Sequence, residues 1–237
     1  MASIFSIDIP RHTKIGIFHL IENCLISSGS KPLFLVTLNP EIALKARQDN
    51  EYKNILKKSV NIVDGFGIKL VAAVKGLKIG ERIAGVELTE KILSVAVKRH
   101  VKTTVVIHSD GLSSKREVER MLENKFFLTN YSVIEEKRNG SRSSIAGDTE
   151  LLIVGLGAPY QEKFIDRRLL NLPNLRCAIG VGGTLDFWTN RQKRAPRIFR
   201  KYGFEWLWRV ITQPNRIKRI WNALVVFPIY GIIYSKK

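Results

Sequence analysis

The first 186 residues repeat one pattern, in which a short run of β-branched and other apolar residues is followed by a stretch with helical periodicity. Short apolar runs between helical stretches are typical of strands in a parallel sheet that is covered on both faces. The six runs are "LFLVTL" (33–38), "SVNIV" (59–63), "TTVVIH" (103–108), "NYSVI" (130–134), "LLIVGLG" (151–157) and "LRCAIGV" (175–181). The sequence therefore predicts an α/β core over residues 1–186, with a mostly parallel sheet flanked by helices.

Polar residues and glycines gather where several of these runs end. Thr37 and Asn39 lie at the end of the first run, and Asp64 directly follows the second. Glycine-rich turns follow the fifth and sixth runs, at 155–161 and 182–186. Because ligands bind at the carboxyl ends of the strands in open α/β sheets, these positions predict a small-molecule site.

Asp64 has two interpretations from the sequence. A carboxylate at a strand end, followed by Gly65 and Gly67, is placed like a general base in a partly desolvated pocket that a substrate can approach closely. Asp-Gly is also a frequent turn dipeptide, in which the Asp side chain bonds to nearby backbone. The pattern alone leaves both interpretations open.

The turn "GLGAPYQEKF" (155–164) places Gly157 and Gln161 at a junction between a strand and a helix. Backbone N–H groups at such a helix start favour a phosphate group. The alternative is a tight turn with Pro159 at the first helical position. Tyr160 stands where a dinucleotide fingerprint needs its third glycine, which disfavours a Rossmann dehydrogenase.

The turn "GVGGTLDF" (180–187) is a similar glycine-rich turn one strand later, and it contains Gly183 and Asp186. Asp186 fits either a bond to a sugar hydroxyl or a cap for the following helix. Arg82, among small and apolar residues in "GERIAGVEL", fits either a phosphate or a surface acid.

No metal site or cofactor is predicted. The four histidines have no ligand spacing, and no DxD pattern is present that would hold a divalent ion against a nucleotide diphosphate. If the substrate is a nucleotide sugar, arginines are the cations available to neutralise the leaving group.

Residues 187–237 form a basic ending that we predict to be a helical, amphipathic appendage. The chain carries a formal net charge of +18, and this segment holds 12 Lys/Arg residues against one acidic residue, Glu205. Its apolar run from Ala223 to Tyr234 is 12 residues long and contains Pro228, whereas crossing a bilayer takes about 20 residues. The run can therefore lie on a membrane, or it can pack on the chain's own core.

A basic nucleic-acid-binding module is the main alternative from another class, because aromatic residues alternate with arginines in this ending. The glycine-tipped turns of the core favour a small-molecule site instead, so no nucleic-acid partner is predicted. The first residues lack the pattern of a secretory signal, which predicts a cytoplasmic protein.

Six blocks of the sequence resemble the WecG/TagA/CpsF glycosyltransferases in order and spacing. They are "TLNPEIAL", "IVDGFGIKLVA", "GERIAGVEL", "VGLGAPYQEKFI", "GVGGTLDFWTNRQKRAP" and "GFEWLWRVITQPNRIKR", and together they run from about Leu33 to Arg219. The sequence departs from the family's pattern at Leu38, where many relatives carry proline, and at Asn190, where glycine is usual.

The resemblance implies a Rossmann-like core of the type called GT-E, and it implies roles for particular residues. Asp64 matches the family's base, which deprotonates the acceptor hydroxyl. The residues matching substrate-binding positions are Thr37, Asn39, Arg82 and Gln161, and the C-terminal arginines that contact the diphosphate match Arg209, Arg216 and Arg219. Gly157, Gly183 and Asp186 belong to the matched glycine-rich blocks and are expected to line the same site.

The implied reaction is an inverting, metal-independent transfer of an N-acetylmannosamine-type sugar from UDP to undecaprenyl-diphosphate-linked N-acetylglucosamine. A lipid acceptor gives the basic ending a purpose, because each Lys or Arg near an anionic bilayer contributes about 1 kcal/mol of attraction. We therefore expect peripheral association with the inner face of the cell membrane. The sequence leaves open whether the chain forms a homo-oligomer.

Overall fold

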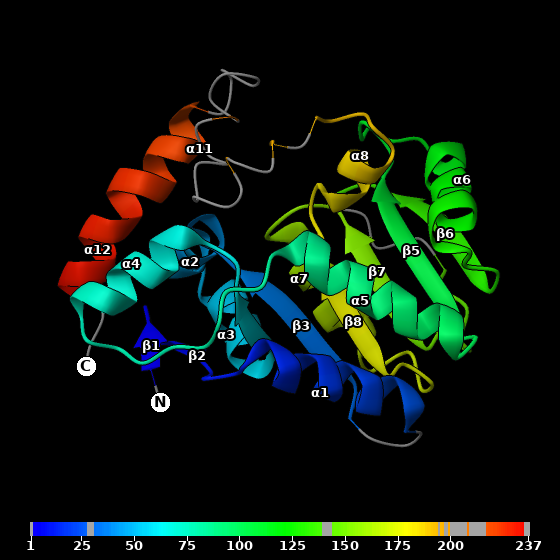
Figure 1. Cartoon of the computed structure of the whole chain (residues 1–237), viewed down its shortest axis with the longest axis horizontal. Helices are drawn as coiled ribbons and strands as arrows, with labels where there is room; N and C mark the ends of the chain where they lie inside the picture. The colour runs from blue at the N-terminus through cyan, green and yellow to red at the C-terminus, as the bar shows by residue number, and fades with distance from the viewer. Residues whose placement is uncertain are drawn as a thin grey trace.

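The computed structural model describes residues 2–27, 31–138, 144–193 and 217–234, together with residues 195, 196, 199 and 208 (Figure 1). Its core is a six-stranded sheet with the order β4-β3-β8-β7-β5-β6, in which all neighbouring strands are parallel. The strands are β3 (Leu33–Leu38), β4 (Val60–Val63), β5 (Thr103–His108), β6 (Tyr131–Glu136), β7 (Leu151–Gly155) and β8 (Cys177–Gly180). All six predicted strands and the Rossmann-like α/β fold are confirmed.

Helices cover both faces of this sheet (Figure 1). One face packs against α1 (Lys14–Ile26), α5 (Gly85–Lys98) and α6 (Lys115–Phe126). The other packs against α2 (Pro40–Gln48), α3 (Asn50–Lys58), α4 (Phe66–Val74) and α7 (Tyr160–Arg168). Successive residues of a strand face opposite sides, so Leu35 joins the first cluster and Val36 the second. Burial on both faces explains why the strands read as continuous apolar runs.

The middle of the sheet contains a reversal of strand order. From β3 the chain passes through α2 and α3 to β4 at one edge. The other neighbour of β3 is β8, which is the last of the six strands in the sequence. The short helix α8 (Thr184–Trp188) follows β8 on the opposite face from α2, where the ring of Trp188 packs 4.8 Å from that of Phe126. The carboxyl ends of β3 and β8 therefore border a topological switch point, the usual place for a ligand in such a fold.

Three features of the fold differ from the sequence predictions. An antiparallel hairpin, β1 (Ala2–Ile4) with β2 (Ile7–Ile9), precedes α1. The helix that starts at Pro40 ends at Gln48, and Asp49 then caps the separate helix α3 by accepting a hydrogen bond from the Tyr52 amide at 2.9 Å. The predicted strand at 130–134 also ends two residues too early, because Glu135 and Glu136 belong to β6.

The C-terminal helix is continuous over α11 (Ile217–Trp221), the π-helical turn η2 (Asn222–Val226) and α12 (Phe227–Tyr234). It packs against α2 and α4, and the side chain of Phe227 is fully buried. Two glycines allow the close approach, because a Cβ on Gly67 would lie 3.3 Å from the Ala223 carbonyl and a Cβ on Gly231 would lie 2.9 Å from Val71.

Residues 217–234 thus pack on the core and do not project from it. Packing on the core is one of the two arrangements that the sequence left open for the apolar run. The predicted domain boundary at residue 186 stays a prediction, and α8 runs across it. No helix within the described residues has the length and apolar character needed to cross a membrane.

Candidate active site

Thr37 and Asp64 lie side by side at the carboxyl edge of the sheet. Thr37 is next to last in β3, and Asp64 follows the last residue of the neighbouring strand β4. Gly85, the first residue of α5, lies against both side chains. A Cβ on Gly85 would be 3.4 Å from Asp64 Oδ2 and 3.5 Å from Thr37 Oγ1. Strand pairing and the start of α5 thus bring the carboxylate and the hydroxyl to one place.

The start of α5 also shapes the electrostatics around Asp64. The residue at its N-cap, Ala84, has no side chain that can bond to the first amides of this 14-residue helix. Unpaired amides and the helix dipole give such a terminus a partial positive charge, which stabilises an anion beside it. Asp64 is half-buried, so water weakens this effect only partly. The positive end of α5 therefore lies beside the Asp64 carboxylate.

Asn39 and Pro40 fix the loop beside Asp64. Asn39 Oδ1 accepts a hydrogen bond from the Ile42 amide at 3.1 Å, which makes Asn39 the N-cap of α2. A Cβ on Gly65 would lie only 2.4 Å from Pro40 Cδ. Gly65 is therefore required to make room for Pro40, a reason that neither sequence interpretation of the Asp-Gly pair contained. A substrate-binding role of Asn39 stays a prediction.

Arg82 lies across the end of β4. Its Nε donates a hydrogen bond to the Asp64 carbonyl at 3.3 Å, and the next residue, Ile83, donates its amide to the Val63 carbonyl at 2.9 Å. Arg82 is half-buried and belongs to the same edge as Thr37 and Asp64. The backbone partner differs from both the phosphate and the surface acid that the sequence suggested, and binding of a phosphate by Arg82 stays a prediction.

Gly157 and Gln161 belong to the loop between β7 and α7. Gln161 Oε1 accepts hydrogen bonds from the amides of Gly157 at 3.1 Å and Gly182 at 2.9 Å, and its Nε2 donates to Glu162 Oε1 at 2.7 Å. Gln161 is only 3% exposed. Pro159 occupies the N-cap of α7, one position earlier than the tight-turn interpretation placed it. The side chain of Gln161 thus joins two strand ends, and its predicted contact with substrate remains untested.

Asp186 ties α8 to the segment that follows β5. Its Oδ1 accepts a hydrogen bond from Ser113 Oγ at 2.7 Å, and Ser113 Oγ also lies 2.7 Å from Thr189 Oγ1. The N-cap of α8 is Gly183, so Asp186 is not the cap that the sequence allowed. Asp186 Oδ2 lies 3.6 Å from where a Cβ of Gly183 would be, so both residues face the same part of the edge. Asn190 takes a left-handed φ of 60°, which explains the glycine preferred there.

Three C-terminal arginines are predicted to contact the diphosphate. Arg209 and Arg216 lie outside the described residues, and Arg219 lies in α11 with its side chain outside them. The C-terminal helix runs in the same direction as α4, because Gly67 meets Ala223 whereas Gly231 meets Val71 further along both helices. Since α4 begins at the carboxyl edge, α11 extends beyond its start toward that edge (Figure 1).

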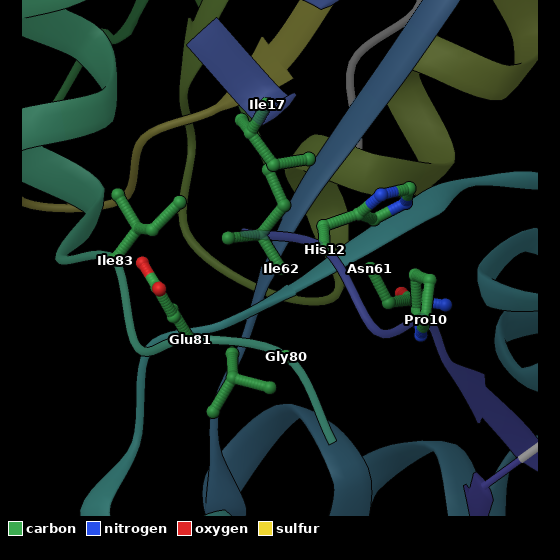
Figure 2. Close-up of a pocket in the computed structure, with 9 residues that line it drawn as sticks. Pro10, His12, Ile17, Asn61, Ile62, Gly80, Glu81 and Ile83 are labelled. Atoms are coloured by element: carbon green, nitrogen blue, oxygen red, sulfur yellow. The ribbon is translucent and has the colours of Figure 1, made fainter. Parts of the chain in front are cut away.

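A small pocket lies where the segment after β2 meets residues 80–83 (Figure 2). The Glu81 amide donates to the His12 carbonyl at 3.0 Å, and a Cβ on Gly80 would lie 2.7 Å from the same oxygen. Its lining residues are Pro10, His12, Ile17, Asn61, Ile62, Val63, Gly80, Glu81 and Ile83. None of the predicted site residues lines it, so it is a seam in the packing beside β4.

No three His, Cys, Asp or Glu side chains within the described part of the chain gather as a metal site would require. Independence from metal stays a prediction of the sequence resemblance.

The family model of the WecG/TagA/CpsF glycosyl transferases matches residues 2–236. The chain belongs to this family. The chain is thus a glycosyltransferase, and the matched region contains the edge of the sheet where Thr37, Asp64 and Arg82 lie. The alternative of a nucleic-acid-binding module is not favoured by these comparisons.

Curated relatives carry the same enzyme name. A protein of Bacillus spizizenii is 30% identical over 207 residues, which cover 85% of this chain and 78% of the relative. A protein of Staphylococcus aureus strain MRSA252 is 28% identical over 240 residues, which cover 99% of this chain and 92% of the relative. Both are named N-acetylglucosaminyldiphosphoundecaprenol N-acetyl-beta-D-mannosaminyltransferase, as is a 28% identical protein of Bacillus subtilis strain 168.

Proposed function

We propose that this glycosyltransferase moves N-acetylmannosamine from UDP to N-acetylglucosamine carried on undecaprenyl diphosphate, in the synthesis of a cell-surface polysaccharide or a teichoic acid linkage unit. The names of the relatives support the transferred sugar and the acceptor. The observation that carries the proposal is the meeting of Asp64 Oδ2 and Thr37 at the start of α5. A glycosyl transfer needs a base at such a place, and the sheet provides one at its ligand-binding edge.

The proposed reaction is a single displacement. Asp64 takes the proton from the acceptor hydroxyl, and the hydroxyl oxygen forms a bond to the anomeric carbon from the face opposite UDP. The bond between that carbon and the UDP oxygen breaks, and its electron pair leaves with the diphosphate. The configuration at the anomeric carbon is therefore inverted.

Arginines take the place of a metal in this scheme. Arg82, held at the end of β4 by the Asp64 carbonyl, and the C-terminal residues Arg209, Arg216 and Arg219 stabilise the charge that develops on the departing diphosphate. The glycine loops that contain Gly157 and Gly183 bind the donor, and Asp186 bonds to a hydroxyl of the sugar.

The lipid acceptor requires the enzyme to work at a bilayer, and two neighbouring helices support this. Exposed apolar side chains lie on α4 and on the C-terminal helix that packs against it: Phe66, Leu70, Val74, Trp221, Ile229, Ile232 and Ile233. Phe66, Leu70 and Val74 are spaced four residues apart, so they share one side of α4. We propose that this side, with the C-terminal helix and the basic residues around it, rests on the anionic inner face of the cell membrane.

Release of UDP tests the reaction and its metal independence together. With purified chain, UDP-N-acetylmannosamine and a short-chain lipid-diphosphate-N-acetylglucosamine, we expect UDP release that needs both substrates and continues when EDTA is added. Arginine side chains remain charged in EDTA, so the leaving group is still stabilised. Release that stops with EDTA and returns with magnesium would contradict the metal-free scheme. No release with this donor would contradict the assigned sugar.

Binding to vesicles tests the membrane surface. The double variant Leu70→Glu/Ile233→Glu is expected to lose flotation with vesicles of phosphatidylglycerol, because it places two carboxylates on the apolar side beside α12. Leu170→Glu is the matched control, since Leu170 is 94% exposed after α7 and lies on neither helix. Equal flotation of the double variant and the control would show that these helices do not contact lipid.

A further inference from the structure

A carboxyl group is fully buried beside the glycine loops of the site. Glu162, in the first turn of α7, is 0% exposed. Both of its oxygens accept hydrogen bonds, Oε1 from Gln161 Nε2 at 2.7 Å and Oε2 from the Tyr52 hydroxyl at 3.0 Å. Burial raises the pKa of Glu162, and these two hydrogen bonds lower it in part. A buried carboxyl group is costly compared with an apolar side chain, so this arrangement needs a purpose beyond filling the core.

Tyr52 is a permanent donor to this carboxyl group. Its side chain is also 0% exposed, and burial, followed by the nearby Glu162, raises the pKa of the Tyr52 hydroxyl far above its ordinary value. The hydroxyl therefore keeps its proton at neutral pH. Tyr52 lies on α3, so this contact links α3 to the start of α7.

Gln161 connects two loops that are distant in the sequence. Its Oε1 accepts from the amides of Gly157, after β7, and Gly182, after β8. Both glycines have left-handed φ values, 77° and 52°, and neither would have an atom within 4 Å of an added Cβ. Gly180 makes room for the connection, because a Cβ there would lie 2.5 Å from Gln161 Nε2. One side-chain oxygen thus sets the spacing of both loops.

The orientation of the Gln161 amide group decides whether this connection exists. The oxygen and nitrogen ends of an amide have almost the same shape, but only the oxygen can accept from two N–H groups. Glu162 accepts from the nitrogen end and so excludes the flipped orientation. In that orientation Gln161 would present N–H groups to the amides of Gly157 and Gly182, and the loops would separate.

We propose that Tyr52, Glu162 and Gln161 form a positioning relay that holds the loops after β7 and β8 at the spacing required by the donor's diphosphate. The relay rests on the proposed function for its ligand, and its three members are positioning residues. A second clamp on the same loop is consistent with this role, because Lys45 Nζ on α2 donates to the Ala158 carbonyl at 2.7 Å. Helices α2 and α3, which lie on one face of the sheet, thereby hold the loop after β7 in place.

Two substitutions at Glu162 separate positioning from general stability. Glu162→Gln and Glu162→Leu both remove a buried ionisable group of similar size, but only glutamine keeps an oxygen that accepts from Gln161. For Glu162→Leu we expect the KM for UDP-N-acetylmannosamine and the Kd for UDP to rise about tenfold, the effect of losing one buried hydrogen bond. The kcat stays within about threefold because Asp64 is untouched, and Glu162→Gln restores the KM and Kd to within about threefold of the parent.

Hydrogen exchange of the Gly157 and Gly182 amides provides a readout that needs no donor. Exchange is expected to speed up about tenfold in Glu162→Leu and to stay near the parent rate in Glu162→Gln. Asp166→Asn, on the same helix with a contact to Lys58 at 3.7 Å, is the control for general loosening of α7.

Parent-like exchange and parent-like UDP affinity in Glu162→Leu would overturn the relay, as would equal losses in the leucine and glutamine variants. If the parent itself binds no UDP, the proposed donor is wrong, and the exchange rates still decide whether Glu162 positions the two loops.

Discussion

Asp64→Asn is expected to lower kcat by about 10²–10⁴-fold, the range measured for loss of a general base. Asparagine keeps the size of the side chain beside Gly85 but cannot take the proton from the acceptor hydroxyl. The affinity for UDP should stay within about threefold of the parent, because a base contributes little to ground-state binding of the donor product. Single-turnover transfer and calorimetric titration with UDP measure the two quantities.

Asp110→Asn is the matched control for this experiment. Asp110 lies two residues after β5 at the same edge of the sheet and is exposed, so the same chemical change is made outside the proposed site. Its turnover should equal that of the parent. Turnover by Asp64→Asn at the parent rate would remove Asp64 as the base and leave only the architecture of the family.

Gly65→Ala is expected to have the second largest effect. Its φ of −100° suits alanine, so backbone strain is not the cause. The added Cβ would lie 2.4 Å from Pro40 Cδ and 3.3 Å from Asn39 Cα, so the loops after β3 and β4 must move apart. A displacement of about 1 Å beside a catalytic group can cost about 10²-fold in rate, and we expect kcat/KM to fall by about that factor.

Thermal unfolding gives the second readout for Gly65→Ala. Overpacking of this kind costs about 1–3 kcal/mol, which in a chain of this size lowers Tm by about 2–12 °C. Gly147→Ala is the control, because no atom lies within 4 Å of an added Cβ at that position. Parent-like activity and Tm in Gly65→Ala would show that Pro40 yields easily and that the Asp-Gly pair is needed for another reason.

The sheet was largely predictable because its signals are local. The run at 103–108 coincides with β5 (Thr103–His108), and the pair Asn39 and Pro40 marks the start of α2. Strand runs and helix caps depend on residues within a few positions of one another, so a single sequence contains them in full.

The N-terminal hairpin was not predicted, and its reason for existing lies elsewhere in the chain. Its strands are three residues each, too short for a clear pattern of alternation. Phe5, at the turn, packs edge to face on Phe227 with 5.8 Å between ring centroids. The hairpin is thus stabilised by a helix more than 200 positions later, which no local pattern can reveal.

For the candidate site too, some features follow from the sequence and others only from the tertiary structure. By itself the sequence determined which residues end the strands, and therefore that Thr37 and Asp64 lie at one edge of a parallel sheet. Only the tertiary structure decided that both meet the start of α5, that Gly65 makes room for Pro40, and that Gln161 joins two loops. The physical reason is that backbone propensity acts over a few residues, whereas these contacts depend on strand order and helix packing across the whole fold.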